Sequence, residues 1–139
     1  MRVTLIINPF SGKRRAPRVR DMAERIAADV GVELTVRMIE GPGHGTDLAR
    51  EAVAGGSDRV LCAGGDGTLN AIAAGLVGTT VPVALLGMGS GNGYVRSLRL
   101  PRDPATAIHL AFTGAPQAVD VCYLNDQLFV GTAGIGFDA

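Results

Sequence analysis

The chain has 139 residues, of which 47% are hydrophobic and 19% are charged, and its formal net charge is zero. This length suits one domain with a buried core, and the balanced charge excludes broad nucleic-acid binding, which needs clustered positive charge. No apolar run reaches the ~20 residues that span a bilayer, and the start lacks the pattern of a secretory signal. Cys62 and Cys122 each lie in an apolar run, so we expect buried thiols in a reducing, cytoplasmic compartment rather than a disulfide or a metal pair.

The first third of the chain alternates strand-like and helix-like runs. Residues 3–7 are apolar except for Thr4 and rich in β-branched side chains, which is typical of a strand buried on both faces. Apolar residues at helical spacing predict a helix over residues 17–30, with Gly31 as its stop. Alternating apolar and polar residues predict a strand over 32–39, and a helix follows to about residue 54 with Thr46 as its cap.

The middle of the chain repeats this alternation. Residues 59–63 form another buried strand, a helical face over 68–77 predicts a helix with Thr68 as its cap, and residues 81–86 form a further apolar strand. Strands that are apolar throughout and alternate with helices form parallel sheets covered on both faces. We therefore expect an α/β fold, a three-layer α/β/α sandwich with a mostly parallel sheet.

The last third predicts one more helix and a β-hairpin. Asp103 before Pro104 is a cap followed by a first-turn proline, and it opens a helix to about residue 112. Two strand-like runs, 117–124 and 127–133, are joined by a dipeptide that suits a tight hairpin turn. We expect this hairpin to end the fold and, where exposed, to offer a surface for a homodimer.

Three glycine-bearing loops follow strands, after Ile7, Ala63 and Leu86. In a parallel sheet these loops open at the same edge, which is where ligands bind in such folds. The loop after Ala63 reads GGDGTLN, and its glycines let the backbone approach a ligand closely and turn its amides inward. The N-terminus of the following helix favours an anion by roughly 0.3–1 kcal/mol. The loops therefore predict a phosphate-binding site.

Asp66 lies inside this predicted site and opposes a phosphate. Two like charges ~4 Å apart at an effective dielectric constant of ~20 repel by about 4 kcal/mol, which exceeds the gain from the helix. A divalent cation such as Mg²⁺ between carboxylate and phosphate reverses the sign. Alternatively, Asp66 accepts a hydrogen bond from a hydroxyl of the ligand or of the acceptor substrate. A purely structural alternative is a tight turn in which Asp66 only caps backbone amides.

The common nucleotide-binding signatures do not explain these glycines. Gly12-Lys13 continues with Arg14, so there is no G-x-x-x-x-G-K-[ST], and Asn92 stands at the third position of G-x-G-x-x-G. The motifs NPFSG (8–12), GGDGTLN (64–70), GSGN (89–92) and VDV…GTAGIGFDA (119–139) instead resemble the diacylglycerol kinase catalytic-domain family, which includes bacterial lipid kinases and sphingosine kinases. GGDGT alone is shared with NAD kinases and nearly with phosphofructokinases, whereas the other motifs favour the lipid branch.

The resemblance implies that residues 1–139 form the ATP-binding catalytic domain, with an NAD kinase/diacylglycerol kinase-like (phosphofructokinase-like) N-terminal fold. It implies ATP as phosphoryl donor, Mg²⁺ as cofactor and a lipid hydroxyl as acceptor. It also implies Asp66 as a catalytic residue and Asp66 and Asp120 near the metal, directly or through water. The nucleotide contacts that it implies come from Asn8, Pro9, Phe10, Ser11, Gly12, Gly64, Gly65, Asp66, Gly67, Thr68, Leu69, Asn70 and Ser90.

Members of that family continue into a second, β-rich domain that carries the proposed catalytic base and further metal ligands. We therefore expect these 139 residues to bind nucleotide without catalysing transfer. Two other function classes stay open: an NAD kinase-like enzyme in which Asp66 activates a ribose hydroxyl, and a regulatory nucleotide-binding module without turnover.

A dense basic segment follows the first glycine-bearing loop. Charge runs of this kind are usually solvated surface, and the alternative is that they steer ATP or contact anionic lipid headgroups, which would place the protein transiently at the inner membrane face. The segment comprises Lys13, Arg14, Arg15, Arg18 and Arg20.

Overall fold

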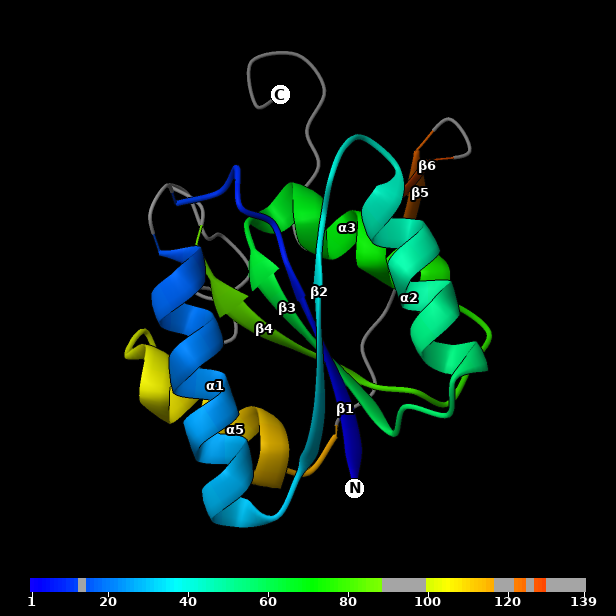
Figure 1. Cartoon of the computed structure of the whole chain (residues 1–139). Helices are drawn as coiled ribbons and strands as arrows, with labels where there is room; N and C mark the ends of the chain where they lie inside the picture. The colour runs from blue at the N-terminus through cyan, green and yellow to red at the C-terminus, as the bar shows by residue number, and fades with distance from the viewer. Residues whose placement is uncertain (13–14, 89–99, 117–121, 125–126, 130–139) are drawn as a thin grey trace.

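The computed structural model describes residues 1–12, 15–88, 100–116, 122–124 and 127–129 of the chain (Figure 1). Helices and strands alternate along most of these residues, and a short pair of strands comes last. In chain order the elements are β1 (Arg2–Ile7), α1 (Ala16–Val30), β2 (Glu33–Met38), α2 (His44–Ala54), β3 (Arg59–Gly64), α3 (Asp66–Leu76), β4 (Val83–Gly87), α5 (Pro104–Thr113), β5 (Cys122–Leu124) and β6 (Gln127–Phe129).

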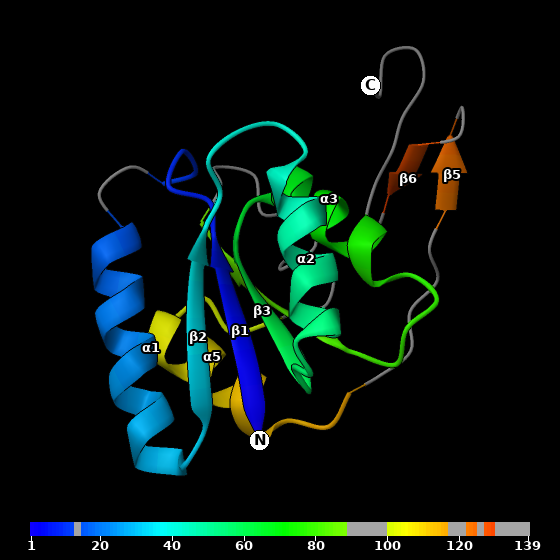
Figure 2. The same ribbon diagram turned by 45° about the vertical axis from the view of Figure 1, so that its right-hand side comes forward.

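The first four strands form one parallel sheet in the order β2-β1-β3-β4. Helices α1 and α5 pack on one face of this sheet, and α2 and α3 pack on the other (Figures 1 and 2). The predicted three-layer α/β/α sandwich with a mostly parallel sheet is therefore confirmed.

The central strand β1 shows why its sequence is largely apolar. Val3, Leu5 and Ile7 face the core shared with α1 and α5, whereas Ile6 faces the core shared with α2 and α3. Leu5, Ile6 and Ile7 have no exposed surface at all. Because successive side chains of a strand point to opposite faces, a strand between two helical layers must be apolar at nearly every position.

Two of the predicted helix boundaries are confirmed and two caps were wrong. Gly31 ends α1 in a left-handed conformation with φ of 75°, and the Asp103 carboxylate accepts hydrogen bonds from the Thr106 hydroxyl (2.7 Å) and amide (3.0 Å) at the start of α5. These bonds hold the pKa of Asp103 below its ordinary value. Thr46 does not cap α2, which begins two residues earlier, and Thr68 does not cap α3.

Thr46 instead joins α2 to α3. Its hydroxyl donates a 2.6 Å hydrogen bond to the carbonyl of Ala71 in the middle of α3. The two helices also meet at buried Gly75, where an added Cβ would lie 2.6 Å from the Thr46 carbonyl oxygen and 2.8 Å from Ala49 Cβ. Small residues therefore allow a close crossing, and this contact fixes the position of α3 against the sheet.

The short strands β5 and β6 pair antiparallel, with Cys122 opposite Phe129 and Leu124 opposite Gln127. This confirms the predicted hairpin within the described residues, and β6 contacts α3 (Figure 2). The outer parts of the predicted strands, residues 117–121 and 130–133, lie outside the described residues.

Two further predictions concern cysteine and the membrane. Cys62 is a free, fully buried thiol whose pKa is raised by burial, as its apolar surroundings predicted, whereas the side chain of Cys122 lies outside the described part of the chain. Among the described helices, none combines the length and the apolar composition that a membrane crossing requires.

Candidate functional site

The three strands that precede the predicted loops, β1, β3 and β4, are neighbours, so their carboxyl ends lie together at one edge of the sheet (Figure 1). Of the third loop, only Gly87 and Met88 are among the described residues. The Asn8 amide donates to the Ala63 carbonyl (2.9 Å), and the Met88 amide donates to the Gly64 carbonyl (2.8 Å). These bonds continue the sheet pairing beyond the last residues of β1 and β4. We call this edge the rim and define it as residues 8–12, 64–70 and 87–88.

The first rim segment turns tightly against the end of β4. Gly12 has φ of 63°, and a Cβ placed on it would lie only 2.6 Å from the Met88 carbonyl oxygen. Both the positive φ angle and the nearby Met88 carbonyl require glycine at position 12, because other residues disfavour this backbone conformation and an added methyl group would have no room. The first rim segment therefore lies directly against the end of β4.

The junction between β3 and α3 depends on the side chain of Thr68. A Cβ on Gly64 would lie 2.7 Å from the Thr68 Cβ and from its hydroxyl oxygen. Thr68 itself is 7% exposed. Glycine at position 64 therefore makes room for Thr68 to pack under the strand end, which is a structural role beside the predicted role in ligand approach.

Asn8 connects this junction to the first rim segment. Its side-chain amide donates a 2.9 Å hydrogen bond to the Thr68 hydroxyl, across 60 positions of sequence. Its side-chain oxygen accepts from the Phe10 amide at 3.0 Å, which closes a local turn and leaves the Phe10 ring 71% exposed. The two hydrogen bonds of the Asn8 side chain thus fix both the shape of the loop at 8–12 and the distance of this loop from α3.

The N-terminus of α3 opens at the rim. Gly65, which has no side chain, is its cap residue, and the Leu69 amide donates to the Gly65 carbonyl (3.0 Å). Asp66 is half-buried at the first helical position, and Gly67 beside it is exposed; among the described residues, no atom outside its own helical turn lies within 4 Å of the place where a Cβ would stand. Helix N-termini attract anions, so this corner combines an anion-binding backbone with one carboxylate.

The structure brings most of the predicted site residues together at the rim, although their side chains differ in access. Phe10 and Gly67 are exposed, whereas Leu69 is 2% exposed and packs in the core between the sheet and α2, so that only its backbone is placed to reach a ligand. Ser90 and Asp120 lie outside the described residues. Within the described residues, no group of three or more His, Cys, Asp or Glu side chains could hold a metal ion.

The sequence predicted Asn8 as a site residue, but it did not predict the two hydrogen bonds by which the Asn8 side chain holds the loop and Thr68. The sequence did contain a signal, since an Asn directly after a strand often accepts a hydrogen bond from the backbone amide two residues later, which forms an Asx turn. Its partner Thr68 gave no such signal, because the pairing exists only once β1 and β3 lie side by side.

The profile described as "Diacylglycerol kinase catalytic domain" matches residues 2–124 of the chain. The chain belongs to this family. It is 38% identical over 139 residues to the "Probable lipid kinase YegS-like" of Chromohalobacter salexigens, covering 97% of this chain and 44% of the relative. It is 31% identical to the "Diacylglycerol kinase" of Mycobacterium tuberculosis, covering 99% of this chain and 47% of the relative.

The fold agrees with this family. A crystal structure of a diacylglycerol kinase from Bacillus anthracis superposes with a TM-score of 0.78 at 27% identity, covering 92% of this chain and 45% of the other. The chain thus spans less than half the length of each of these relatives. The family and its kinase-type fold are established, whereas the activity and substrates of a whole protein are matters for proposal.

The hydrogen bond between Asn8 and Thr68 predicts a measurable coupling. Thr68→Val keeps the shape of the side chain but removes the acceptor, and we expect it to lower the free energy of unfolding by about 1–2 kcal/mol. Asn8→Ala should cost a similar amount, and the double variant should lose about 1 kcal/mol less than the sum. Urea denaturation of the four proteins measures this. If the losses of unfolding free energy in the two single variants add up exactly to the loss in the double variant, the coupling is absent and the account is contradicted. The control is Thr35→Val, at an exposed position of β2, which we expect to show no coupling to Asn8→Ala.

Proposed function

We propose that the rim binds ATP with its phosphates over the N-terminus of α3, and that it serves the transfer of the γ-phosphoryl group to a lipid hydroxyl. One observation carries the proposal: at the junction of β3 and α3, a helix N-terminus whose cap residue is Gly65, the carboxylate of Asp66 and the exposed Gly67 lie together at the carboxyl edge of a parallel sheet. Family membership and the names of the lipid kinase relatives support the same reading.

The phosphates of ATP need hydrogen-bond donors that approach them closely without a steric clash. Backbone amides in the first turn of α3 point toward the rim, because helical amides at an N-terminus face away from the helix body. The absence of a side chain at exposed Gly67 leaves this backbone open to close approach. The loop at 8–12, held over β4 by Gly12, supplies the second wall, with exposed Phe10 available to cover an apolar part of the nucleotide.

The donor set at the rim fits Mg²⁺. This ion prefers oxygen ligands, keeps several waters and is usually held by one or two carboxylates together with substrate phosphates. Asp66 is the one carboxylate among the described rim residues, and Asp120 is the proposed second. The bound ion would neutralise phosphate charge beside Asp66, which removes a repulsion of about 4 kcal/mol at ~4 Å.

The proposed reaction is an in-line displacement. The acceptor hydroxyl oxygen forms a bond to the γ-phosphorus, the bond from that phosphorus to the β–γ bridging oxygen breaks, ADP leaves and the hydroxyl proton passes to a base. Catalysis of this kind depends mainly on positioning and charge neutralisation. Asp66 either holds the metal or accepts a hydrogen bond from the acceptor hydroxyl. For these 139 residues alone, we propose ATP binding without turnover.

A transient contact with an anionic membrane surface belongs to the same proposal. Arg15 and Arg18 are exposed at the start of α1, next to the first rim segment, whereas Arg20 pairs with Glu24 at 3.1 Å. Exposed arginines gain about 1 kcal/mol each near an anionic leaflet. Such a contact would bring the rim near a lipid acceptor at the inner membrane face.

The open position at Gly67 gives a binding test that is independent of folding. The methyl group of Gly67→Ala meets no atom of the described residues beyond its own helical turn, and alanine is a better helix former than glycine, so the free energy of unfolding should stay or rise by up to ~1 kcal/mol. The added methyl group would crowd the phosphates, and we expect the dissociation constant of Mg-ATP to rise at least about tenfold in calorimetry. Gly41→Ala is the matched control, because its position is also free of neighbours within 4 Å but lies outside the rim. Unchanged affinity in Gly67→Ala would contradict the proposed phosphate position.

Asp66→Asn tests the catalytic role. The change keeps the size of the side chain but removes its charge, so we expect retained folding and a fall in transfer rate of about 10²-fold or more. Transfer is measured with labelled ATP and diacylglycerol, sphingoid or other glycerolipid acceptors, on these 139 residues and on the protein as its gene encodes it. Labelled NAD in place of lipid would favour the NAD kinase-like alternative. Binding of Mg-ATP by the encoded protein without transfer to any acceptor would leave only a nucleotide-binding module.

A further inference from the structure

The strand β2 forms one edge of the sheet, and in the part of the chain that the structure describes no strand pairs with its outer side (Figure 2). The amides of Glu33 and Ile39 donate inward, to the carbonyls of Met1 and Ile7 in the β1 segment. Because alternate residues of a strand bond to the same neighbour, the backbone groups of Leu34, Val36 and Met38 point outward. An edge of this kind is able to add another strand.

The outward residues restrict how a second copy of β2 pairs with the first. In an antiparallel pair, two outward-pointing residues must stand opposite each other. Pairing Leu34 with Val36 of the second copy satisfies this rule and places a two-fold axis at Thr35. Glu33 then stands opposite Arg37 of the second copy, and Arg37 opposite its Glu33. Shifting the register by two residues either way removes both contacts, and a shift of four sets Glu33 against Glu33 or Arg37 against Arg37.

The charges of β2 are therefore self-complementary in one register only. Opposite charges directly across an antiparallel pair stabilise it, and like charges destabilise it. Within the chain, Glu33 pairs with Arg2 (3.4 Å) and Arg37 with Glu51 (2.9 Å), and all four side chains are more than 40% exposed. Pairing across the axis would join these two ion pairs into a row of alternating positive and negative side chains, and neither ion pair would have to break.

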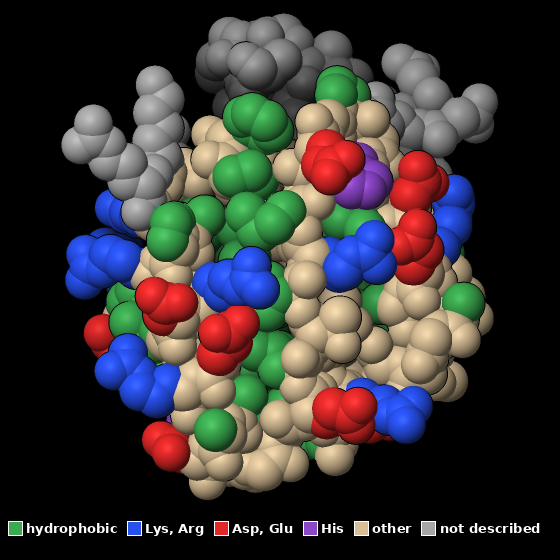
Figure 3. Space-filling model, viewed as in Figure 1, with side chains coloured by type: hydrophobic (Ala, Val, Ile, Leu, Met, Phe, Trp, Pro, Cys, Tyr) green, Lys and Arg blue, Asp and Glu red, His purple; other side chains and the backbone are tan. Residues whose placement is uncertain are grey.

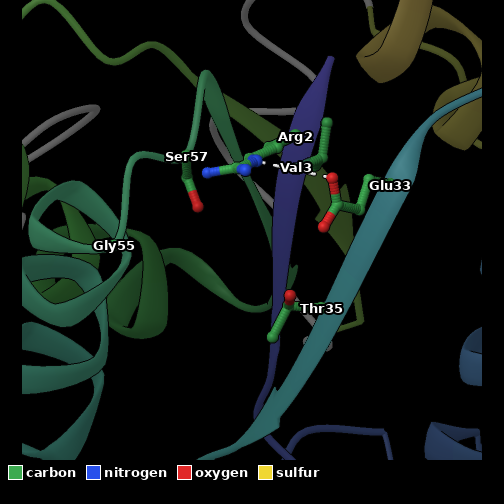
Figure 4. A pocket seen from close by; sticks show the side chains of 6 residues that line it. All are labelled: Arg2, Val3, Glu33, Thr35, Gly55 and Ser57. Carbon is green, nitrogen blue, oxygen red and sulfur yellow. Dashed lines mark ion pairs between the residues drawn. The ribbon is translucent and has the colours of Figure 1, made fainter.

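The surroundings of β2 have room and apolar surface for a partner. On one face, half-buried Leu34, Val36 and Met38 lie beside Met22 and Ile26 of α1, and Figure 3 shows hydrophobic side chains gathered between α1 and β2 with charges of both signs around them. The opposite face carries a hollow lined by Arg2, Val3, Glu33, Thr35, Gly55 and Ser57, in which Arg2 reaches across to Glu33 (Figure 4).

We propose that β2 is a homodimer interface, in which two copies of this chain pair antiparallel about an axis at Thr35 and form one continuous eight-stranded sheet. A pair of short strands alone buries less than the ~1,200 Å² of a stable interface. The dimer therefore depends on the adjoining apolar seam and on the ion pairs, and its dissociation constant should fall in the micromolar range. The surface differs from the hairpin predicted from sequence.

The arrangement leaves both rims open. The two-fold axis reverses the strand direction between copies, so the carboxyl edges that carry the rims face opposite ways. Pairing through β2 should therefore leave the affinity of the rim for Mg-ATP unchanged. The inference stands whether or not the proposed function is correct.

Charge reversal tests the register. Glu33→Arg or Arg37→Glu alone sets like charges across both symmetric contacts, and we expect the dimer dissociation constant in sedimentation equilibrium to rise at least about tenfold. An equimolar mixture of the two variants should restore dimers to within about threefold of the unaltered chain, because each contact again joins opposite charges. The double variant in one chain should dimerise likewise.

Arg102→Glu is the control for net charge, since Arg102 is exposed ahead of α5 and α5 packs against α1, β3 and β4 rather than at the β2 edge. It should leave dimerisation unchanged, and circular dichroism checks the fold of each variant. The proposal would be overturned if the unaltered chain is monomeric at all concentrations, or if neither single variant changes the dimer dissociation constant. It would also be overturned if the equimolar mixture and the double variant both stay monomeric.

Discussion

The rim depends on one hydrogen bond between distant parts of the chain, from the Asn8 side-chain amide to the Thr68 hydroxyl. It is possible only because β1 and β3 are neighbours in a parallel sheet and because Gly64 leaves space for Thr68 under the strand end. A larger residue at position 64 would push α3 away from the sheet and separate the two loops. The close crossing of α2 and α3 at Gly75 resists the same movement from the far side.

These contacts would allow the Asp66 carboxylate and the proposed triphosphate to lie at the same corner of the rim. Asp66 and the first amides of α3 are held on a helix whose start is fixed by Thr68 and whose body is fixed by α2. Fixed groups lose little freedom when a ligand binds, so a bridging cation or hydroxyl finds its partners already in place. In the proposed function, the charge of Asp66 would select ligands that bring a counter-charge or an alcohol with them.

The sequence predicted those features whose causes are local. Apolar runs predicted the buried strands, Gly31 and Asp103 marked helix ends, and the motif loops marked the rim. The roles of Thr46 and Thr68 were wrong because a hydroxyl near a helix start suits a cap equally well, and only the packed fold shows that their partners are Ala71 and Asn8. The alternation in residues 32–39 correctly predicted the strand β2, but its position at the edge of the sheet follows from strand order, which no short-range pattern contains.

The central claim is that Mg-ATP binds where the first and third rim segments meet the start of α3. Nuclear magnetic resonance of the ¹⁵N-labelled chain measures this directly, by titrating Mg-ATP and following each backbone amide. The account predicts the largest saturable shifts at Phe10, Gly12, Gly65, Gly67 and Thr68, with little change at Arg2 and Ser57 on the opposite edge of the sheet. Saturable shifts confined to that opposite edge, with the rim amides unmoved, would contradict it.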